Sequence, residues 1–278
     1  MAVIAMTREM GSLGKDVALG LAERARRKVV YHEIIEPVAD KMRLRKSHVE
    51  RFVDGRSGLM ERLTTDRTSL CIYTAEETFK LLRNPENYVI RGWGAVPLLR
   101  SVPHVVRVRI CAPFEVRVRN MMERLNSSDR AAIEKEMRMS EEAHSAIVRR
   151  HFGIDWHDPE HYHLVLSTAN LSTESCIEQV ETLARQAQFQ ETPESRKVAE
   201  DLALEASVRG ALRRDARTAG LALMINCMDK IATLTGLVPD SDAAQAANDV
   251  AAGVLGVTRV RNHLRAASMA RAHYLAES

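Results

Sequence analysis

The stretch Val-Ile-Ala-Met-Thr-Arg-Glu-Met-Gly-Ser-Leu-Gly-Lys at residues 3–15 decides the fold of this chain. An apolar strand runs into a glycine turn, a lysine and a segment with helical spacing. Gly11 and Gly14 allow the backbone to turn with its N–H groups toward an anion, and Lys15 adds a positive charge at a helix N-terminus. The full G-x-x-x-x-G-K-[ST] pattern would place glycine at Glu9 and serine or threonine at Asp16. We interpret the stretch as a phosphate-binding loop that departs from this pattern at two positions.

Composition sets the broad class of the protein. The chain has 278 residues, of which 45% are hydrophobic and 4% aromatic, so aliphatic side chains fill the core. Its net charge is +3, from 40 basic and 37 acidic residues, which does not require a nucleic-acid partner. The four cysteines are scattered without metal-ligand spacing, as in a reducing compartment. We see no signal peptide or membrane-spanning segment and expect a cytoplasmic protein.

The first two-thirds of the sequence alternates between strand-like and helix-like segments. This alternation predicts a doubly wound α/β domain with a parallel sheet. Residues 43–67 are basic and polar with little periodicity, and Asp66 is positioned to cap the helix that follows. The expected strands are 3–6, 29–31, 88–91, 104–111 and 162–167, and the expected helices are 15–26, 34–42, 67–83, 114–152 with a break at 126–128, and 173–188.

The pattern changes after a polar, proline-containing linker at 188–196. A helix over 198–214 is followed by two short strands, an alanine-rich helix and a last strand, which predicts a compact α+β module. Gly236 and Gly256 are assigned to tight turns. The two strands are expected at 221–226 and 231–238, the helix at 241–255 and the last strand at 257–264.

Six short blocks then follow one another along residues 1–188. They are Thr-Arg-Glu-Met-Gly-Ser-Leu-Gly-Lys at 7–15, Tyr-His-Glu-Ile-Ile at 31–35, Val-Ile-Arg-Gly-Trp-Gly-Ala at 89–95, Val-Arg-Ile-Cys-Ala-Pro-Phe-Glu-Val-Arg at 108–117, His-Phe-Gly-Ile-Asp-Trp at 151–156 and Tyr-His-Leu-Val-Leu-Ser-Thr at 162–168. In this order they resemble the cytidylate-kinase-like branch of the P-loop nucleoside monophosphate kinases. That resemblance implies a P-loop NTPase fold with a helical lid.

The last part of the chain resembles a BON domain. The resemblance rests on Ala-Thr-Leu-Thr-Gly-Leu-Val at 232–238 and Gly-Val-Thr-Arg-Val-Arg-Asn-His-Leu at 256–264. We therefore expect two domains, a cytidylate-kinase-like domain over 1–188 and a BON-like domain over 197–270. By elimination, the second domain is expected to be a regulatory or interaction module.

The kinase resemblance implies the cofactors ATP and Mg²⁺ and a set of residues that bind them. Gly11, Ser12 and Gly14 correspond to the phosphate cradle, and Lys15 to the residue that contacts the β- and γ-phosphates. Asp16 stands where the family usually offers a hydroxyl to Mg²⁺, so its carboxylate is the candidate metal ligand. The alternative is that Asp16 only occupies the first turn of a helix, where acidic residues are favoured.

The acceptor and lid regions depart further from the family pattern. His32 stands where an aspartate is usual, and Trp93 stands where an arginine is usual in Gly-Arg-Gly. Arg91 points to the opposite face of an extended segment from its neighbour and does not simply replace that arginine. In the lid, Glu141 and His144 match an Asp-x-x-Arg pair. The implied catalytic residues are Lys15, Arg117, Arg149 and Arg150, and the implied substrate-binding residues are His32, Arg91, Trp93, Glu141 and His144.

Histidines gather near Trp156, and metal ligation by them is conceivable. His157 and His161 lie four residues apart, the spacing of two ligands on one helical face. Pro159 between them argues against a helix there, and hence against a preformed metal site.

Together these features predict an ATP-dependent, cytidylate-like nucleotide kinase with a C-terminal regulatory or interaction module. Its expected partners are a nucleotide and a small phosphate acceptor, of which a pyrimidine monophosphate is the one the resemblance implies. Homo-oligomerisation stays open, and no nucleic acid is expected. The alternative is a catalytically inactive nucleotide-binding protein that signals through the BON-like domain. A scaffold that uses neither ligand is a third option.

Overall fold

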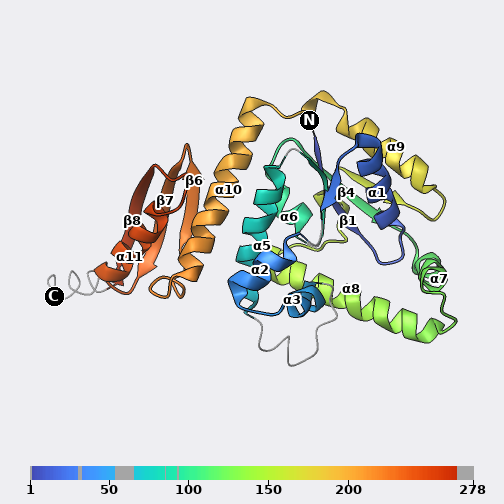
Figure 1. Ribbon diagram of the computed structural model, residues 1–278, viewed down its shortest axis with the longest axis horizontal. Helices are drawn as coiled ribbons and strands as arrows, with labels where there is room; N and C mark the ends of the chain where they lie inside the picture. The colour runs from blue at the N-terminus through green and yellow to red at the C-terminus, as the bar shows by residue number, and fades with distance from the viewer. Residues whose placement is uncertain (1, 31–32, 54–65, 85, 93, 268–278) are drawn as a thin grey trace. The chain divides into compact units, whose positions relative to one another are not determined.

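The computed structural model describes residues 2–30, 33–53, 66–84, 86–92 and 94–267 (Figure 1). The chain divides into two compact units, residues 1–196 and 197–278. Each unit has its own sheet and its own hydrophobic core.

The first unit is built on a five-stranded parallel sheet with the strand order β2-β3-β1-β4-β5. Because all strands run the same way, the segments that follow them emerge at one edge of the sheet. The strand β1 lies at the centre, between β3 and β4, so the loop that follows it is surrounded by the ends of its neighbours. The strands are β1 (Val3–Arg8), β2 (Lys28–Val30), β3 (Asn87–Arg91), β4 (Val105–Cys111) and β5 (Leu164–Ser167).

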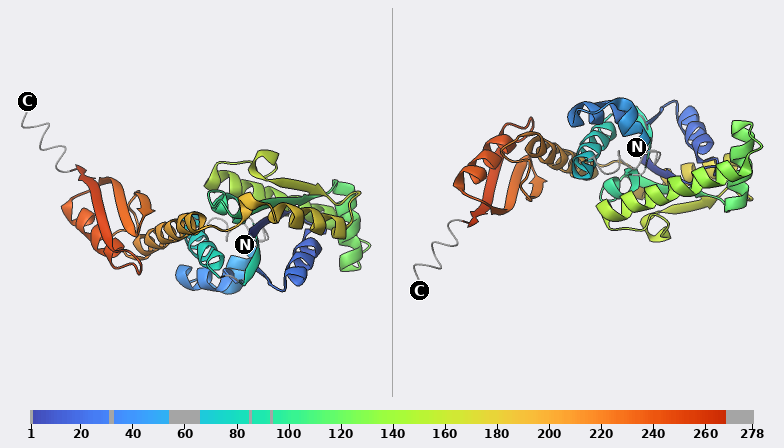
Figure 2. Two further views of the ribbon diagram at one scale, coloured as in Figure 1. Left: turned by 90° about the horizontal axis from the view of Figure 1, so that it is seen from above. Right: turned by 90° about the horizontal axis from the view of Figure 1, so that it is seen from below.

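Helices lie on both sides of this sheet (Figures 1 and 2). The helices α1 and α9 pack against each other and share the main core with the strands, whereas α5 and α6 contact each other and the strands β1 and β3. The helices are α1 (Gly14–Ala25), α2 (Ile35–Met42), α3 (Lys46–Val53), α5 (Arg67–Leu82), α6 (Ala95–Leu99), α7 (Phe114–Leu125), α8 (Arg130–Phe152) and α9 (Thr173–Ala184), with short 3-10 turns at Pro159–His161 and Ala187–Phe189. This confirms the predicted doubly wound α/β class.

Local sequence explains most of the boundaries. Asp66 caps α5 by accepting a hydrogen bond from the Ser69 amide, as expected. The helical region after Phe114 breaks at Asn126, which adopts the left-handed conformation and ends α7. The helix α3 was not expected, because its apolar positions are few. Val49 is nevertheless buried against α2 and α5, so tertiary packing stabilises a helix that the pattern does not indicate.

The second unit contains α10 (Pro193–Arg214), β6 (Met224–Met228), β7 (Ile231–Val238), α11 (Ser241–Ala252) and β8 (Arg259–Ala266). The strands β6 and β7 form an antiparallel hairpin, and β8 runs parallel to β7. Small buried alanines such as Ala247 and Ala251 let α11 approach the sheet closely. This small α+β arrangement agrees with the predicted module.

Several expectations for the second unit were wrong in detail, including the start of β6, which lies at Met224 rather than at residue 221. The helix α10 begins at Pro193 rather than at Val198, because proline fits the first turn of a helix, where its missing N–H is not needed. Gly236 lies inside β7 with a φ of 149°, not in a turn, so its role is to accommodate a distorted strand position.

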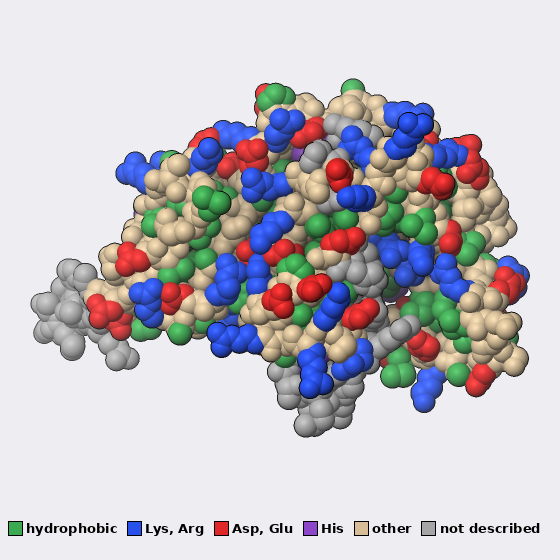
Figure 3. Space-filling view, viewed as in Figure 1, with side chains coloured by type: hydrophobic (Ala, Val, Ile, Leu, Met, Phe, Trp, Pro, Cys, Tyr) green, Lys and Arg blue, Asp and Glu red, His purple; other side chains and the backbone are tan. Residues whose placement is uncertain are grey.

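The described helices include none that is long and apolar enough to cross a membrane. Basic and acidic side chains are interspersed on the face shown in Figure 3, in keeping with the nearly balanced charge of the whole sequence.

Candidate phosphate-binding site

The loop between β1 and α1 is held in a conformation that only glycine allows at Gly11. That residue has a φ of 81°, and a Cβ atom there would run into the carbonyl oxygen of Arg117. A Cβ atom at Gly14 would lie 2.7 Å from the Cβ of Arg8. Between the two glycines, Leu13 adopts the left-handed conformation and leads into α1. The two predicted cradle glycines therefore both lie where the backbone is approached closely.

The carbonyl oxygens of the loop all accept hydrogen bonds from within the protein. Glu9 O accepts from the Ser12 amide, and the Ser12 hydroxyl lies 2.8 Å from the same oxygen and 3.1 Å from Ile110 O. The next three carbonyls bond to side chains: Met10 O to Arg117 Nη1 at 3.3 Å, Gly11 O to Asn120 Nδ2 at 2.8 Å and Ser12 O to Thr168 Oγ1 at 2.9 Å. The loop is thus tied to α7 and to the end of β5 by its acceptors.

The amides at the other end of the loop have no such partners. Among the described residues, the N–H groups of Leu13, Gly14 and Lys15 have no hydrogen-bond acceptor. These three consecutive donors lie at the N-terminus of α1, where the helix dipole adds partial positive charge. Satisfied carbonyls and unsatisfied amides together make this end of the loop suited to an anion.

Lys15 and Asp16 lie beside these amides. The Lys15 side chain is exposed and has no ion pair or hydrogen bond within the described part of the chain. The Asp16 carboxylate lies 3.2 Å and 3.3 Å from Arg124 Nη2 on α7, and both side chains are partly exposed. Lys15 is therefore available to a ligand, whereas Asp16 already has a cationic partner.

Glu9 replaces the first glycine of the phosphate-loop pattern and is buried. Its carboxylate lies 2.5 Å from Arg109 Nη2 and 3.3 Å from Arg117 Nε, and it accepts a hydrogen bond of 3.2 Å from the Ala112 amide. These partners come from the end of β4 and from α7. These donors hold the Glu9 carboxylate in place, so that it links the end of β1 to its neighbours.

Arg117 is buried at the centre of this network. It donates from Nε to Ala112 O at 2.9 Å, from Nη1 to Met10 O, and pairs with Glu141 on α8. One guanidinium therefore connects the loop, the start of α7 and the lid helix α8. This placement favours a positioning role for Arg117 over contact with a ligand.

His144 belongs to the same region of α8 as Glu141. Its ring stacks on Trp156 with 4.6 Å between centroids, and the Trp156 ring also lies under the Arg109 guanidinium. Burial, together with the nearby charges of Arg8 and His157, lowers the pKa of His144 to about 4. The histidine is therefore neutral at physiological pH and supports the Arg109–Glu9 pair through Trp156.

The remaining predicted site residues lie outside this network or outside the described residues. Arg149 and Arg150 are exposed at the C-terminal end of α8, more than two helical turns beyond Glu141. Arg91 ends β3 beside Met6 of β1, at the edge of the sheet from which the loop emerges. His32 and Trp93 are not among the described residues.

The histidines near Trp156 do not converge on one point. His157 Nδ1 lies 3.1 Å from an oxygen of Asp155, whereas His163 Nδ1 accepts a hydrogen bond from the Arg107 amide. Over the described part of the chain, no group of three or more His, Cys, Asp or Glu side chains is placed to hold a metal ion.

Comparison with family models bears on the first unit directly. Residues 3–170 match the model of the cytidylate kinase-like family. This chain belongs to the cytidylate kinase-like family. The match spans more than half of the sequence and includes β1, the loop, α7 and α8. Residues 200–268 match the BON domain model. Both resemblances expected from the sequence are thus confirmed.

Two solved structures are similar to this chain. An uncharacterized protein from Eubacterium ventriosum superimposes with a TM-score of 0.52 at 18% identity, covering 66% of this chain and 98% of that one. A shikimate kinase from Acinetobacter baumannii, solved with shikimate, gives a TM-score of 0.40 at 15% identity over 66% of this chain and 92% of its own. No match is found among curated proteins.

Three residues of this cytidylate kinase-like site were not predicted from the sequence. They are Arg109, Asn120 and Thr168, and all three hold the loop or its carboxylate from elsewhere in the chain. Arg109 and Thr168 lie within the family-like blocks at 108–117 and 162–168, so the blocks identified the segments that hold the loop, although not the residues themselves. Nothing in the local sequence indicates that Asn120 reaches a loop carbonyl.

Proposed function

We propose that this protein is an ATP-dependent nucleotide kinase with a C-terminal regulatory or interaction module, working in the cytoplasm. The observation that carries the proposal is the polarity of the loop, whose carbonyls at residues 9–12 are satisfied while the amides of Leu13, Gly14 and Lys15 are not. Such a loop binds a phosphate chain without rearranging its own backbone. Membership of a kinase-like family makes ATP the candidate phosphate donor.

The residues of the loop fit both ATP and Mg²⁺. The free amides and Lys15 would hold the phosphates, and Asp16 would hold Mg²⁺, which supplies charge neutralisation during phosphoryl transfer. Arg124, which pairs with Asp16 in this structure, lies beside the same loop, and its guanidinium is of the type that would pair with phosphate oxygens. A pyrimidine monophosphate is the acceptor that the family resemblance implies. Arg91 lies at the edge of the sheet from which the loop emerges, so it is the candidate to contact the phosphate of that acceptor.

A catalytically inactive, nucleotide-binding regulator is the second candidate. The observation that favours it is the placement of Arg117, whose guanidinium is buried against Glu9 and Glu141 instead of facing the loop amides. In this alternative the loop still binds nucleotide, but no buried arginine is released to neutralise a transferring phosphoryl group.

One experiment separates the two candidates. Purified protein is incubated with ATP, Mg²⁺ and a panel of nucleoside monophosphates, and ADP formation is measured with and without each acceptor. Acceptor-dependent ADP supports the kinase, and its absence with every acceptor, together with measurable ATP binding, supports the regulator. Failure to bind ATP would contradict both.

The second unit has features of an interaction module for an acidic partner. Side chains alternate along β8, so Arg259, Arg261, His263 and Arg265 lie in one row, on the face opposite α11. All four are exposed, and the strands β6, β7 and β8 contain no acidic residue. On the same face, Leu237 is 70% exposed. Within the described residues the three arginines of this row have no ion pair, and such cations suit a surface of opposite charge.

We expect this row to dominate binding to an anionic matrix. In the full-length protein, Arg261→Glu should lower the salt concentration needed for elution from heparin, because it places a negative charge inside the basic row. The control is Arg45→Glu, which makes the same change in net charge at an exposed position of the first unit. Equal shifts for the two variants would contradict a role for the row.

A further inference from the structure

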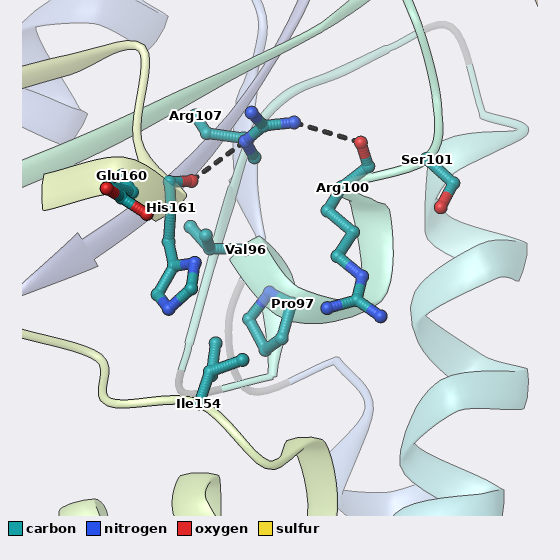
Figure 4. A pocket seen from close by; sticks show the side chains of 8 residues that line it. All are labelled: Val96, Pro97, Arg100, Ser101, Arg107, Ile154, Glu160 and His161. Carbon is teal, nitrogen blue, oxygen red and sulfur yellow. Dashed lines mark hydrogen bonds between the residues drawn. The ribbon is translucent and has the colours of Figure 1, made fainter. Parts of the chain in front are cut away.

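A pocket with a cavity volume of about 300 Å³ opens on the first unit, apart from the phosphate-binding loop. Its floor is apolar, from Val96 and Pro97 of α6 and from Ile154 after α8 (Figure 4). Its polar lining comes from Arg100, Arg107 and the segment that precedes β5. A volume of about 300 Å³ is at the lower end of the range for small-molecule sites.

Arg107 is held rigidly in this pocket. Its Nε donates to His161 O at 2.8 Å and its Nη1 donates to Arg100 O at 2.9 Å (Figure 4). Both acceptors are neutral backbone carbonyls, so these bonds fix the guanidinium without cancelling its charge. Nη2 has no partner among the described residues. A guanidinium that is already immobilised loses little conformational entropy when it binds a ligand.

A second cation lies in the same pocket. The Arg100 side chain is exposed and has no ion pair in the described structure, and Figure 4 shows its guanidinium and the His161 ring on either side of Pro97. Burial lowers the pKa of Arg107, and the charge of Arg100 lowers it further. Glu160 also lines the pocket, but within the described structure it forms no ion pair with Arg100 or Arg107.

We propose that this pocket binds a small phosphate monoester, with the phosphate between Arg100 and Arg107 and the carbon skeleton over Pro97 and Ile154. Two guanidinium groups present paired N–H donors that match phosphate oxygens. A dianionic phosphate neutralises both charges, which a single carboxylate does not. The apolar floor gives the organic part of the ligand a surface to cover, so the ester binds more tightly than inorganic phosphate.

This site is lined by no residue of the phosphate-binding loop and does not depend on it. Arg107 and Arg109 are alternate residues of β4 and therefore project from the same face of the sheet. Arg109 bonds to the Trp156 and His157 carbonyls, and Arg107 bonds to the His161 carbonyl, so both arginines hold the segment that connects α8 to β5. Failure of one site in a binding experiment thus leaves the other to be tested separately.

The experiment uses the full-length protein with Lys15→Ala, which weakens phosphate binding at the loop. Glycerol 3-phosphate, inorganic phosphate and glycerol are titrated separately by calorimetry. We expect glycerol 3-phosphate to bind more tightly than inorganic phosphate and glycerol not to bind. Adding Arg100→Gln should weaken binding of the ester by about tenfold or more, because it removes one charge-assisted contact to the phosphate.

Two further variants separate the loss of a specific contact in the pocket from a general loss of positive charge. Arg107→Lys retains the charge but loses the paired donors, and it should also weaken the ester, whereas Arg45→Gln at an exposed position elsewhere should not. Circular dichroism and the unfolding midpoint check that each variant is folded. The proposal is overturned if the ester does not bind at millimolar concentration, if inorganic phosphate binds as tightly as the ester, or if folded Arg100→Gln protein binds the ester as well as its parent.

Discussion

The two ends of the phosphate-binding loop carry charge in opposite ways. At the β1 end, Glu9 is buried and receives bonds from Arg109, Arg117 and the Ala112 amide. At the α1 end, Lys15 is exposed and has no partner in the described structure. The Glu9 charge is neutralised by partners that hold the backbone, whereas the Lys15 charge remains available to a ligand. The comparison shows that a departure from the sequence pattern at Glu9 need not mean loss of ligand binding.

The same division appears in the backbone of the loop. The carbonyls at residues 9–12 are bonded to α7, to the end of β5 and to one another, and the amides at residues 13–15 are not bonded. A loop whose acceptors are already satisfied does not need to rearrange when an anion arrives, so less of the binding energy is lost to ordering it. Glu9 thus contributes to binding by preorganising the loop.

The largest expected effect comes from removing the buried carboxylate. Glu9→Ala leaves the Arg109 and Arg117 guanidinium groups buried without it, which should lower the free energy of unfolding by about 3–5 kcal/mol. Urea denaturation measures the change. Glu86→Ala is the matched control, because its carboxylate pairs with Lys28 at the surface and its loss should change stability little. If the two variants are equally stable, Glu9 does not hold the loop.

The next effect concerns the shape of the loop between its two ends. Gly11→Ala should cost about 2–4 kcal/mol, because it combines a positive φ with a clash against the Arg117 carbonyl. Gly153→Ala is the control, since Gly153 has a φ of 67° but nothing within 4 Å of its Cβ position. That variant should cost only the conformational term of about 1 kcal/mol. A cost at Gly11 no greater than at Gly153 would show that α7 does not press on the loop.

The exposed end of the loop should behave in the opposite manner. Lys15→Ala should weaken ATP binding by about tenfold or more while leaving the unfolding midpoint nearly unchanged, because the ammonium makes no contact within the described structure. Calorimetry and urea denaturation of one preparation give both quantities. Lys46→Ala, which removes a surface lysine paired with Glu36, should change neither. Loss of stability without loss of ATP affinity would reverse the roles that we assign to the two ends.

The last effect is a pH dependence of the buried end. The folded protein holds the pKa of His144 at about 4, below the value of about 6.5 in an unfolded chain. Between these values the unfolded state binds the extra proton, so the contribution of His144 to stability is present above pH 6.5 and is lost as the pH falls toward 4. The expected loss from pH 7 to pH 5 is about 2 kcal/mol.

His144→Phe tests this directly, because phenylalanine keeps a ring against Trp156 and does not titrate. The variant should lose less stability than the parent protein when urea denaturation is repeated at pH 7 and pH 5. Other groups titrate equally in both proteins and cancel in the comparison. Parallel pH profiles would mean that His144 is not held neutral in the folded state.

The sequence predicted the fold more completely than the site, for physical reasons. Alternating strands and helices, the Asp66 cap and the glycine turn are local signals, and each was read correctly. The pairing of Glu9 with Arg109 joins residues 100 positions apart, so no local pattern reports it. Arg117 was expected to be a catalytic residue, yet its position against the Phe114 ring and beside Met10 is set by how α7 packs on the loop.

The central claim is that the amides at residues 13–15 and Lys15 bind phosphate while the Glu9 network only shapes the loop. A crystal structure with bound ADP tests it most directly. We expect the β-phosphate within hydrogen-bonding distance of the Leu13, Gly14 and Lys15 amides, with Arg117 still paired to Glu9 and Glu141. The account would be contradicted by an ADP whose phosphates lie away from these amides, or by an Arg117 that has left Glu9 to bind them.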